Sequence, residues 1–362
     1  MKALVIGGTG PTGPVIVTGL QDRGYDVAVL HRGTHEVPQT GDVEHIHVDP
    51  HFVEEITPAL HGRHFDLVIA TYGRLRLLVE PVASVSDRLI TVGGTVYSFR
   101  HSLPAKEGDQ RRVENPLAEK IVSTEQVLLK AHEAGLFNLT HFRYPGLYGP
   151  RQIAPREWSV IRRILDGNLY IPVADGGLTL QSRSYVENAA FATLLAVDHP
   201  EVSSGQMYNV ADEYTPSDAD RAYAIARAMG KDIELVNYPL AASRPAYFWG
   251  VSRDLDFHQT GNPPSTGHQL LDISKIQDHL GYRDAVDFKT AIQRTVDYYV
   301  ENPLERGGAD EERIGDPFDY TAELAYRAEL LNFQSRAAEI VYTDFSFKHM
   351  YDHPHTPTRT QE

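Results

Sequence analysis

Seven residues near the N-terminus, GGTGPTG at positions 7–13, have the composition and spacing of a phosphate-binding loop. The first glycine permits a tight turn, and the one at position 10 leaves no side chain where a pyrophosphate must approach the backbone. The last allows close packing of a following helix, whose free N–H groups attract phosphates. We therefore predict a dinucleotide site that includes Gly7, Thr9, Gly10, Pro11, Thr12 and Gly13.

The residues on either side of this loop predict the elements that would position it. Residues 2–6, KALVI, are typical of a buried strand, and residues 14–23 carry apolar side chains at helical spacing. Residues 26–30 predict a second strand. A glycine turn with no ligand is the alternative, but the order strand, loop, helix and strand favours a cofactor site.

Arg32 follows the second predicted strand, where NAD-binding proteins usually carry an acidic residue. A guanidinium group would instead pair with a 2′-phosphate, so we predict NADP in preference to NAD. The alternative is that Arg32 is a solvated loop residue. At the carboxyl ends of the next two predicted strands, we expect Asp49 to lie near the adenine and Ala70 and Thr71 to lie beside the middle of the cofactor.

The composition is that of a soluble globular protein large enough for two lobes, with 362 residues, 41% of them hydrophobic and 23% charged. The chain has no cysteine, which excludes disulfides, thiolate catalysis and cysteine-bound zinc and favours a cytoplasmic location. No apolar run is long enough to span a membrane, and the N-terminus enters a strand without a signal peptide. The net charge of −15 argues against nucleic-acid binding.

The alternation of predicted strands and helices indicates an α/β fold with a doubly wound parallel sheet of the Rossmann type. We assign residues 1–150 and 184–215 to the dinucleotide-binding domain, and residues 151–183 and 216–301 to a smaller C-terminal substrate lobe. Residues 302–362 form a helical C-terminal extension, which we expect to wrap around the body or a partner subunit. Its histidines lack carboxylates at ligand spacing, so we predict no metal site.

Several segments together resemble the extended short-chain dehydrogenase/reductase superfamily, in particular its nucleotide-sugar epimerases and dehydratases. They are GGTGPTG at 7–13, TVYS at 95–98, FRYPGLYGPR at 142–151, RSYVENAA at 183–190, GQMYNVAD at 205–212 and DISKIQDHLGYR at 272–283. The resemblance implies a nicotinamide cofactor, a small-molecule substrate and a homodimer formed through the helix at 117–134. It also implies that the cofactor contacts Tyr144 and Pro145 and that the substrate contacts Gly93, Thr95, Tyr148, Arg151 and the phosphate-binding Arg183. The alternative for Arg183 is an ion pair with Glu187, one helical turn on.

The same resemblance implies a catalytic serine or threonine and a Tyr-x-x-x-Lys pair, which this chain lacks. When the helix is aligned without a gap, Leu117 stands at the tyrosine position and Ile121 at the lysine position. The hydroxyl position falls on Gly93. Lys120 points about 100° around the helix from Ile121, from where its long stem would reach a cofactor ribose, or it is a solvated helix residue.

Three functions remain open when an intact cofactor loop is combined with a missing proton-transfer group. The first is an enzyme with relocated acid/base groups, for which His101, Tyr97 and Lys120 are the catalytic candidates. The second is a non-redox lyase or isomerase whose cofactor is structural or transiently reduced. The third is a non-catalytic NADP sensor or RNA-associated protein. An aromatic cluster at 244–250 either walls a ring-containing substrate or forms the core of the second lobe.

Overall fold

The computed structural model describes residues 1–33, 37–71, 73–98, 102–113, 116–239, 268–344, 346–351, 353 and 355–356. Its main feature is a parallel seven-stranded sheet in the order β10-β6-β5-β4-β1-β2-β3. These strands are β1 (Lys2–Ile6), β2 (Asp26–His31), β3 (Glu44–His47), β4 (Leu67–Ala70), β5 (Arg88–Gly94), β6 (Asn138–Tyr144) and β10 (Gln206–Asn209). The reversal of strand order between β1 and β4 is that of a doubly wound Rossmann sheet, which confirms the predicted fold class.

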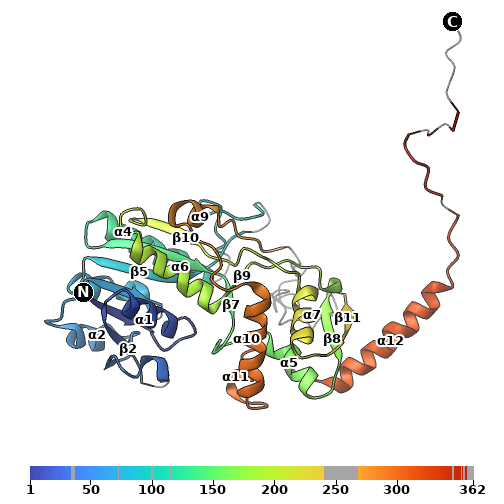
Figure 1. The fold of residues 1–362 in the computed structure, drawn as a ribbon, viewed down its shortest axis with the longest axis horizontal. Coiled ribbons are helices and arrows are strands. Elements are labelled where there is room, and N and C mark those ends of the chain that lie inside the picture. The colour runs from blue at the N-terminus through green and yellow to red at the C-terminus, as the bar shows by residue number, and fades with distance from the viewer. Residues whose placement is uncertain are drawn as a thin grey trace, which may run out of the picture. The chain divides into compact units, whose positions relative to one another are not determined.

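Helices cover both faces of this sheet (Figure 1). Strand β1 is buried on both sides because Ala3 and Val5 belong to one core cluster and Leu4 and Ile6 to the other. The first cluster includes α1 (Gly13–Asp22), α6 (Val186–Asp198) and α9 (Ser274–Leu280), and the second includes α2 (Val53–Leu60), α3 (Val79–Ala83) and α4 (Pro116–Glu133).

Two of these helices pack unusually closely. A Cβ atom built on Gly19 of α1 would lie 2.3 Å from Cδ1 of Leu194 in α6. A larger residue at position 19 would therefore require the Leu194 side chain to move.

The second half of the first unit contributes two small parallel pairs. Strand β7 (Gly146–Tyr148) pairs with β9 (Arg183–Tyr185), and β8 (Tyr170–Ala174) pairs with β11 (Glu234–Tyr238). Pro172 is compatible with β8 because, among the described residues, this strand pairs on one edge only, with β11. The neighbouring helices are α5 (Trp158–Leu165), α7 (Asp218–Ala228) and α10 (Phe288–Glu301).

The chain divides into two compact units, Met1–Phe318 and Asp319–Glu362. The first unit extends beyond residue 301 because the segment around α11 (Ala309–Glu312) is tied to α5. Trp158 Nε1 donates to Glu311 Oε1 at 2.8 Å, and the buried guanidinium of Arg163 pairs with Asp316 at 2.6 Å. The division of the first unit into two lobes stays a prediction.

The second unit contains α12 (Tyr320–Ala338), which agrees with the helix expected in the C-terminal extension. Its expected wrapping around the body or a partner stays a prediction. None of the described helices combines the length and the hydrophobicity that crossing a lipid bilayer requires.

Candidate cofactor and active site

The glycine loop connects β1 to α1 and folds back tightly on itself. Gly7 has a φ of 89°, which favours glycine, and its N–H donates to the Leu30 carbonyl at 3.0 Å. A Cβ on Gly13 would lie 2.2 Å from the Gly8 carbonyl oxygen, so the loop itself fills this space. A Cβ on Gly10 would meet only the Gly7 oxygen, at 3.5 Å. The space beside Gly10 is therefore available to a ligand.

The start of α1 is suited to an anion. Thr12 occupies the N-cap without a side-chain hydrogen bond to the helix, and Pro14 stands in the first turn. The first backbone N–H groups are thus not capped by that side chain, and the helix dipole places partial positive charge there. These features fit the pyrophosphate of a dinucleotide.

Four more of the predicted cofactor residues lie at or shortly after the carboxyl ends of strands. Ala70 ends β4, and the Thr71 hydroxyl lies 3.3 Å from the Gly7 carbonyl oxygen, to which it donates. Asp49 follows β3, and its carboxylate accepts hydrogen bonds from the backbone and ring nitrogens of His51. Although burial alone would raise it, these bonds hold the pKa of Asp49 below its usual value. Arg32 follows β2 and is exposed.

Tyr144 and Pro145 lie at the end of β6, but the tyrosine side chain turns into the core. Its hydroxyl donates to the Ala189 carbonyl at 2.7 Å and contacts Thr193. Burial raises the pKa of Tyr144 well above its usual value. Its backbone carbonyl accepts the N–H of Thr95 at 3.2 Å. Any contact of Tyr144 with a cofactor would thus have to come from its backbone.

The position expected for a catalytic hydroxyl is filled by another side chain. A Cβ on Gly93 would lie 2.8 Å from both Cε1 and Nε2 of His141. This imidazole is held by Thr91, whose Oγ1 lies 2.8 Å from His141 Nδ1. Because Thr91 and His141 are paired in the register of β5 and β6, the strands themselves direct the ring into this space. The glycine at position 93 is required by the protein's own packing.

The first two turns of α4 carry apolar residues where the family's Tyr–Lys pair is expected. Leu117 is 62% exposed, and Cδ1 of Ile121 would lie 3.5 Å from a Cβ on Gly94. Ile121 therefore faces the end of β5, and its correspondence to the family's lysine position stays a prediction. Lys120 is exposed on the same helix.

A buried charge cluster lies around Glu125, one turn of α4 after Ile121. Glu125 of α4 pairs with Arg111 at 2.6 Å and with Arg143 at 2.8 Å, and it lies 3.6 Å from His141 Nε2. Burial alone would raise the pKa of Glu125, but His141 and the two arginines hold it well below its usual value. Sequence reasoning missed this cluster. The available signal was an acidic residue on the buried stripe of α4 that also includes Ala118 and Leu128.

Tyr97, a catalytic candidate, belongs to the same network. Its side chain is 3% exposed, and its hydroxyl donates to Asn209 Oδ1 and accepts from Arg143 Nη1, each at 2.6 Å. Burial raises the pKa of Tyr97 despite the nearby arginines. A catalytic role for Tyr97 stays a prediction and would require this network to open. His101 and the aromatic cluster at 244–250 lie outside the described residues.

Three predicted residues, Thr95, Pro145 and Arg183, line one cavity of about 80 Å³. Its wall also includes Gly146, Arg156, Gln181, Ser182, Gln269 and Leu271. The guanidinium of Arg183 is buried and donates to Glu157 Oε1 at 2.9 Å, so its acidic partner is Glu157 rather than Glu187. Arg221 lies 3.8 Å from the same carboxylate oxygen. A phosphate bound at Arg183 would therefore lie close to the negative charge of Glu157.

The other three predicted substrate residues, Gly93, Tyr148 and Arg151, do not line this cavity. Tyr148 is buried, donates to Asp212 at 2.8 Å and stacks under the guanidinium of Arg221. Burial raises the pKa of Tyr148 well above its usual value. Arg151 is half-buried and has a φ of 61°. Sequence reasoning thus identified part of the cavity wall and missed Gly146, the first residue of β7.

Known proteins share both sequence and fold with this chain. Residues 86–211 match the model of the NAD dependent epimerase/dehydratase family. A 3-diazoavenalumate denitrifying reductase of Streptomyces sp is 24% identical over 249 residues, which are 60% of this chain and 78% of that protein. Across the first curated relatives, the matched segments span from 47% to 78% of the relative, about half of most of them.

Among solved structures, the UDP-glucose 4-epimerase of Thermotoga maritima with UDP-glucose is similar, with a TM-score of 0.68 and 19% identity over 84% of this chain and all of the epimerase. A UDP-glucuronic acid 4-epimerase from Bacillus cereus in complex with NAD has a TM-score of 0.65 and 18% identity, with the same coverage. The chain therefore shares the fold of these epimerases, and its residues 86–211 are similar to the NAD dependent epimerase/dehydratase family.

Proposed function

We propose that this protein is an enzyme of the epimerase/dehydratase type that binds a nicotinamide dinucleotide, NADP in preference to NAD. The observation that carries the proposal is the loop between β1 and α1, where the space beside Gly10 stays open while the space beside Gly13 is closed by the protein. The family match and the NAD found in the similar Bacillus cereus epimerase support a nicotinamide cofactor.

The residues around the loop fit the parts of such a cofactor. The start of α1 would hold the pyrophosphate, Asp49 the adenine side, and Arg32 the 2′-phosphate. The nicotinamide would then lie toward the carboxyl ends of β5 and β6, next to Gly93 and Ile121. Bound there, the cofactor would exchange a hydride with a hydroxyl or carbonyl group of the substrate.

Proton transfer would need a group other than the family's usual tyrosine. Leu117 and Ile121 carry no proton, and Gly93 has no room for a hydroxyl. We retain His101, Tyr97 and Lys120 as candidates, of which Lys120 is exposed close to Ile121. The cavity lined by Thr95 and Arg156 favours a small substrate with an anionic or hydrogen-bonding group.

The closed space beside Gly93 favours one alternative, a sensor that binds the dinucleotide without turning it over. A homodimer is part of both proposals. It is supported by Leu117 and Val127 of α4, two large apolar side chains that are exposed in the single chain, at 62% and 39%.

Calorimetry with NADPH and NADH tests the cofactor. We expect NADPH to bind more tightly and the variant Gly10→Ala to lose about 10- to 100-fold in affinity, because its methyl group occupies the ligand's space. Gly10→Ala should fold normally, since its Cβ makes only an ordinary contact. Gly108→Ala, whose Cβ meets no atom within 4 Å, is the matched control. Absence of binding by both nucleotides contradicts the proposal, as does unchanged binding by Gly10→Ala.

An activity screen separates the enzyme from the sensor. The protein would be incubated with oxidised cofactor and a set of nucleotide sugars and small hydroxyl compounds, and the formation of reduced nicotinamide and of altered products would be followed. Product formation that depends on Gly10 supports the enzyme. Tight binding with no product for any compound favours the sensor.

A further inference from the structure

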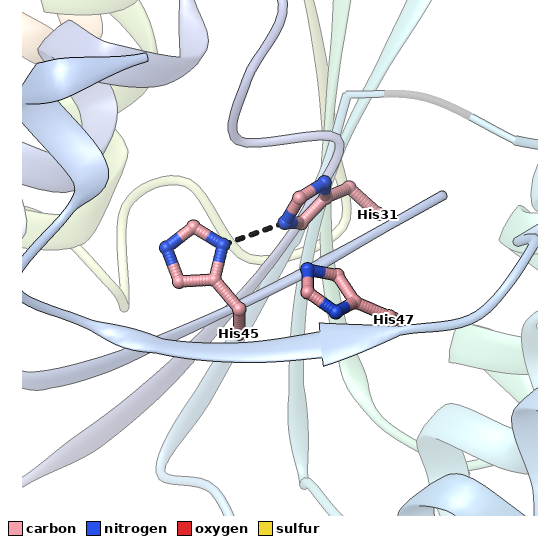
Figure 2. Close-up of side chains that lie close together, drawn as sticks. All are labelled: His31, His45 and His47. Atoms are coloured by element: carbon pink, nitrogen blue, oxygen red, sulfur yellow. Dashed lines mark hydrogen bonds between the residues drawn. The ribbon is translucent and has the colours of Figure 1, made fainter. Parts of the chain in front are cut away.

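Three histidines meet at the edge of the sheet next to the glycine loop (Figure 2). His31 ends β2, and His45 and His47 lie two residues apart on β3, so their side chains share one face. The parallel register places His31 opposite His47 and Val29 opposite His45. Because β3 is the outermost strand, the cluster lies at the border with solvent. His31 is buried, His45 is half-buried and His47 is exposed.

The rings turn toward one another (Figure 2). Their centroids are separated by 4.8 to 5.9 Å, and one nitrogen from each ring lies within 4.8 Å of the other two. The closest approach is 2.6 Å, between His31 Nε2 and His45 Nδ1. Two buried or half-buried imidazoles are thus held with their nitrogens in contact, and the third ring stands beside them at the surface.

A hydrogen bond from its other ring nitrogen fixes the orientation of the His45 ring. Its Nε2 lies 2.6 Å from the carbonyl oxygen of Thr40, at the end of the short helix η1 (Pro38–Thr40), and donates to it. Nδ1 is thereby left with a lone pair aimed at the other two rings. A hydrogen bond from the remote ring nitrogen to a backbone carbonyl is the usual support of a metal-binding histidine.

We propose that His31, His45 and His47 bind one divalent transition-metal ion of the Zn²⁺ class. Imidazole nitrogens suit Zn²⁺, Cu²⁺ and Ni²⁺. At zinc–nitrogen distances of about 2.0–2.1 Å in a tetrahedral site, the ligand nitrogens stand about 3.3 Å apart. The His31–His45 pair needs to open by less than about 1 Å, and the exposed His47 supplies the remaining movement. Water would complete the coordination.

Metal binding competes with a hydrogen-bonded arrangement of the same rings. The Gly33 N–H donates to His31 Nδ1 at 3.1 Å, so His31 carries its proton on Nε2 and donates it to His45 Nδ1. A metal on His31 Nε2 would move that proton to Nδ1 and displace the Gly33 N–H. Gly33 has a φ of 75° and is the residue in this turn whose backbone reorients at least cost.

Titration of the full chain with Zn²⁺, Ni²⁺ or Co²⁺, in the absence of nucleotide, tests the site. We expect one ion per chain, and with Co²⁺ a visible absorption band of tetrahedral coordination. His47→Ala should weaken binding by about 10- to 100-fold and leave the fold intact, because the side chain is exposed. His45→Ala should weaken binding by a similar factor.

Two control variants keep the result specific. His61→Ala removes an exposed histidine outside the cluster. The double variant His349→Ala and His353→Ala removes a pair in the C-terminal unit whose rings lie 4.6 Å apart. Both should bind metal like the wild type. The proposal is overturned if the wild type binds no metal, if His47→Ala binds normally, or if the double variant abolishes binding. Because no nucleotide is present, failure of the proposed cofactor would not affect the outcome.

Discussion

Two glycines at the same end of the sheet, Gly10 and Gly93, have opposite surroundings. A methyl group added to Gly10 would have a backbone oxygen as its nearest neighbour, at the ordinary contact distance of 3.5 Å. A methyl group added to Gly93 would meet the His141 ring at 2.8 Å. The first glycine leaves room for a ligand, and the second leaves room for a side chain of the protein. The meaning of a glycine thus depends on what occupies the space of its absent Cβ.

The two regions also differ in how they are stabilised. The glycine loop is held by backbone hydrogen bonds, such as those between Gly7 and Leu30 and between Gly10 and Gly7. The β5–α4 region is held by buried charges around Glu125. A backbone-built loop can present its N–H groups to a ligand. A charge cluster that is already paired contributes to stability instead, and removal of one member leaves its partners uncompensated.

The largest loss of stability is therefore expected from Glu125→Gln. The variant keeps the size of the side chain but leaves Arg111 and Arg143 without their counter-charge, which should cost about 3–5 kcal/mol in unfolding free energy. The pKa of Glu125 is lower in the folded than in the unfolded chain. The Glu125 carboxylate consequently contributes to the unfolding free energy at a pH above about 4.5, its pKa in the unfolded chain. This contribution is lost as the pH falls through the lower pKa of the folded chain.

Urea unfolding from pH 7 to pH 3 would measure this contribution. The difference in stability between the wild type and Glu125→Gln should be largest at neutral pH and should narrow below about pH 4.5. A difference that does not change with pH would mean that the carboxylate charge is not what stabilises the region.

A smaller loss of stability, arising in the glycine loop, is expected from Gly13→Ala. Its Cβ would lie 2.2 Å from the Gly8 oxygen, so the backbone of the loop must shift, at a cost of about 1–3 kcal/mol. We expect a lower melting temperature together with loss of NADPH binding. The paired variant Gly10→Ala should lose binding without the drop in melting temperature. Equal stability of the two variants would contradict the distinction between a space that the protein fills and one that it leaves open.

The sequence predicted the region that is built from neighbouring residues. The strand at 2–6, the glycines at 7–13 and the helix after them signal one another over a short stretch, and the structure confirms the resulting Rossmann sheet. Strand β8 was not predicted because Pro172 interrupts its pattern, and only its pairing with β11 reveals it.

The charge cluster and the histidine cluster show why the rest could not be predicted. Glu125 meets Arg111 and Arg143 only after α4 packs on β5 and β6, and no local spacing connects these positions. His31 meets His47 only through the register of β2 and β3. A one-residue slip of β3 would place its histidines on the other face. Long-range packing and register are set by the whole fold, so short sequence patterns do not contain them.

Gly93→Ser tests the closed space directly. The added side chain should clash with His141 and lower the unfolding free energy by about 1–3 kcal/mol. His141→Ala removes the ring, so the double variant should be more stable than the sum of the two single effects predicts, by about 0.5–3 kcal/mol. Urea unfolding of the four proteins completes the cycle. Additive effects would show that His141 is not what excludes a side chain at position 93.

The smallest expected effect concerns the choice between NADP and NAD. The proposed pyrophosphate contacts are common to both dinucleotides, whereas the proposed contact with the 2′-phosphate is made by NADP alone. Arg32 is exposed after β2, beyond the loop that would hold the pyrophosphate. A charge-assisted hydrogen bond to a 2′-phosphate contributes about 1.5–3 kcal/mol to binding. Arg32→Ala should therefore weaken the binding of NADPH by about 10- to 100-fold and leave the binding of NADH nearly unchanged. Calorimetry with both nucleotides measures the two effects, and Arg283→Ala, which removes an exposed arginine after α9, is the control. Equal weakening of both nucleotides would place Arg32 at a shared part of the cofactor. No change for either would make it a solvated loop residue and remove the argument for NADP.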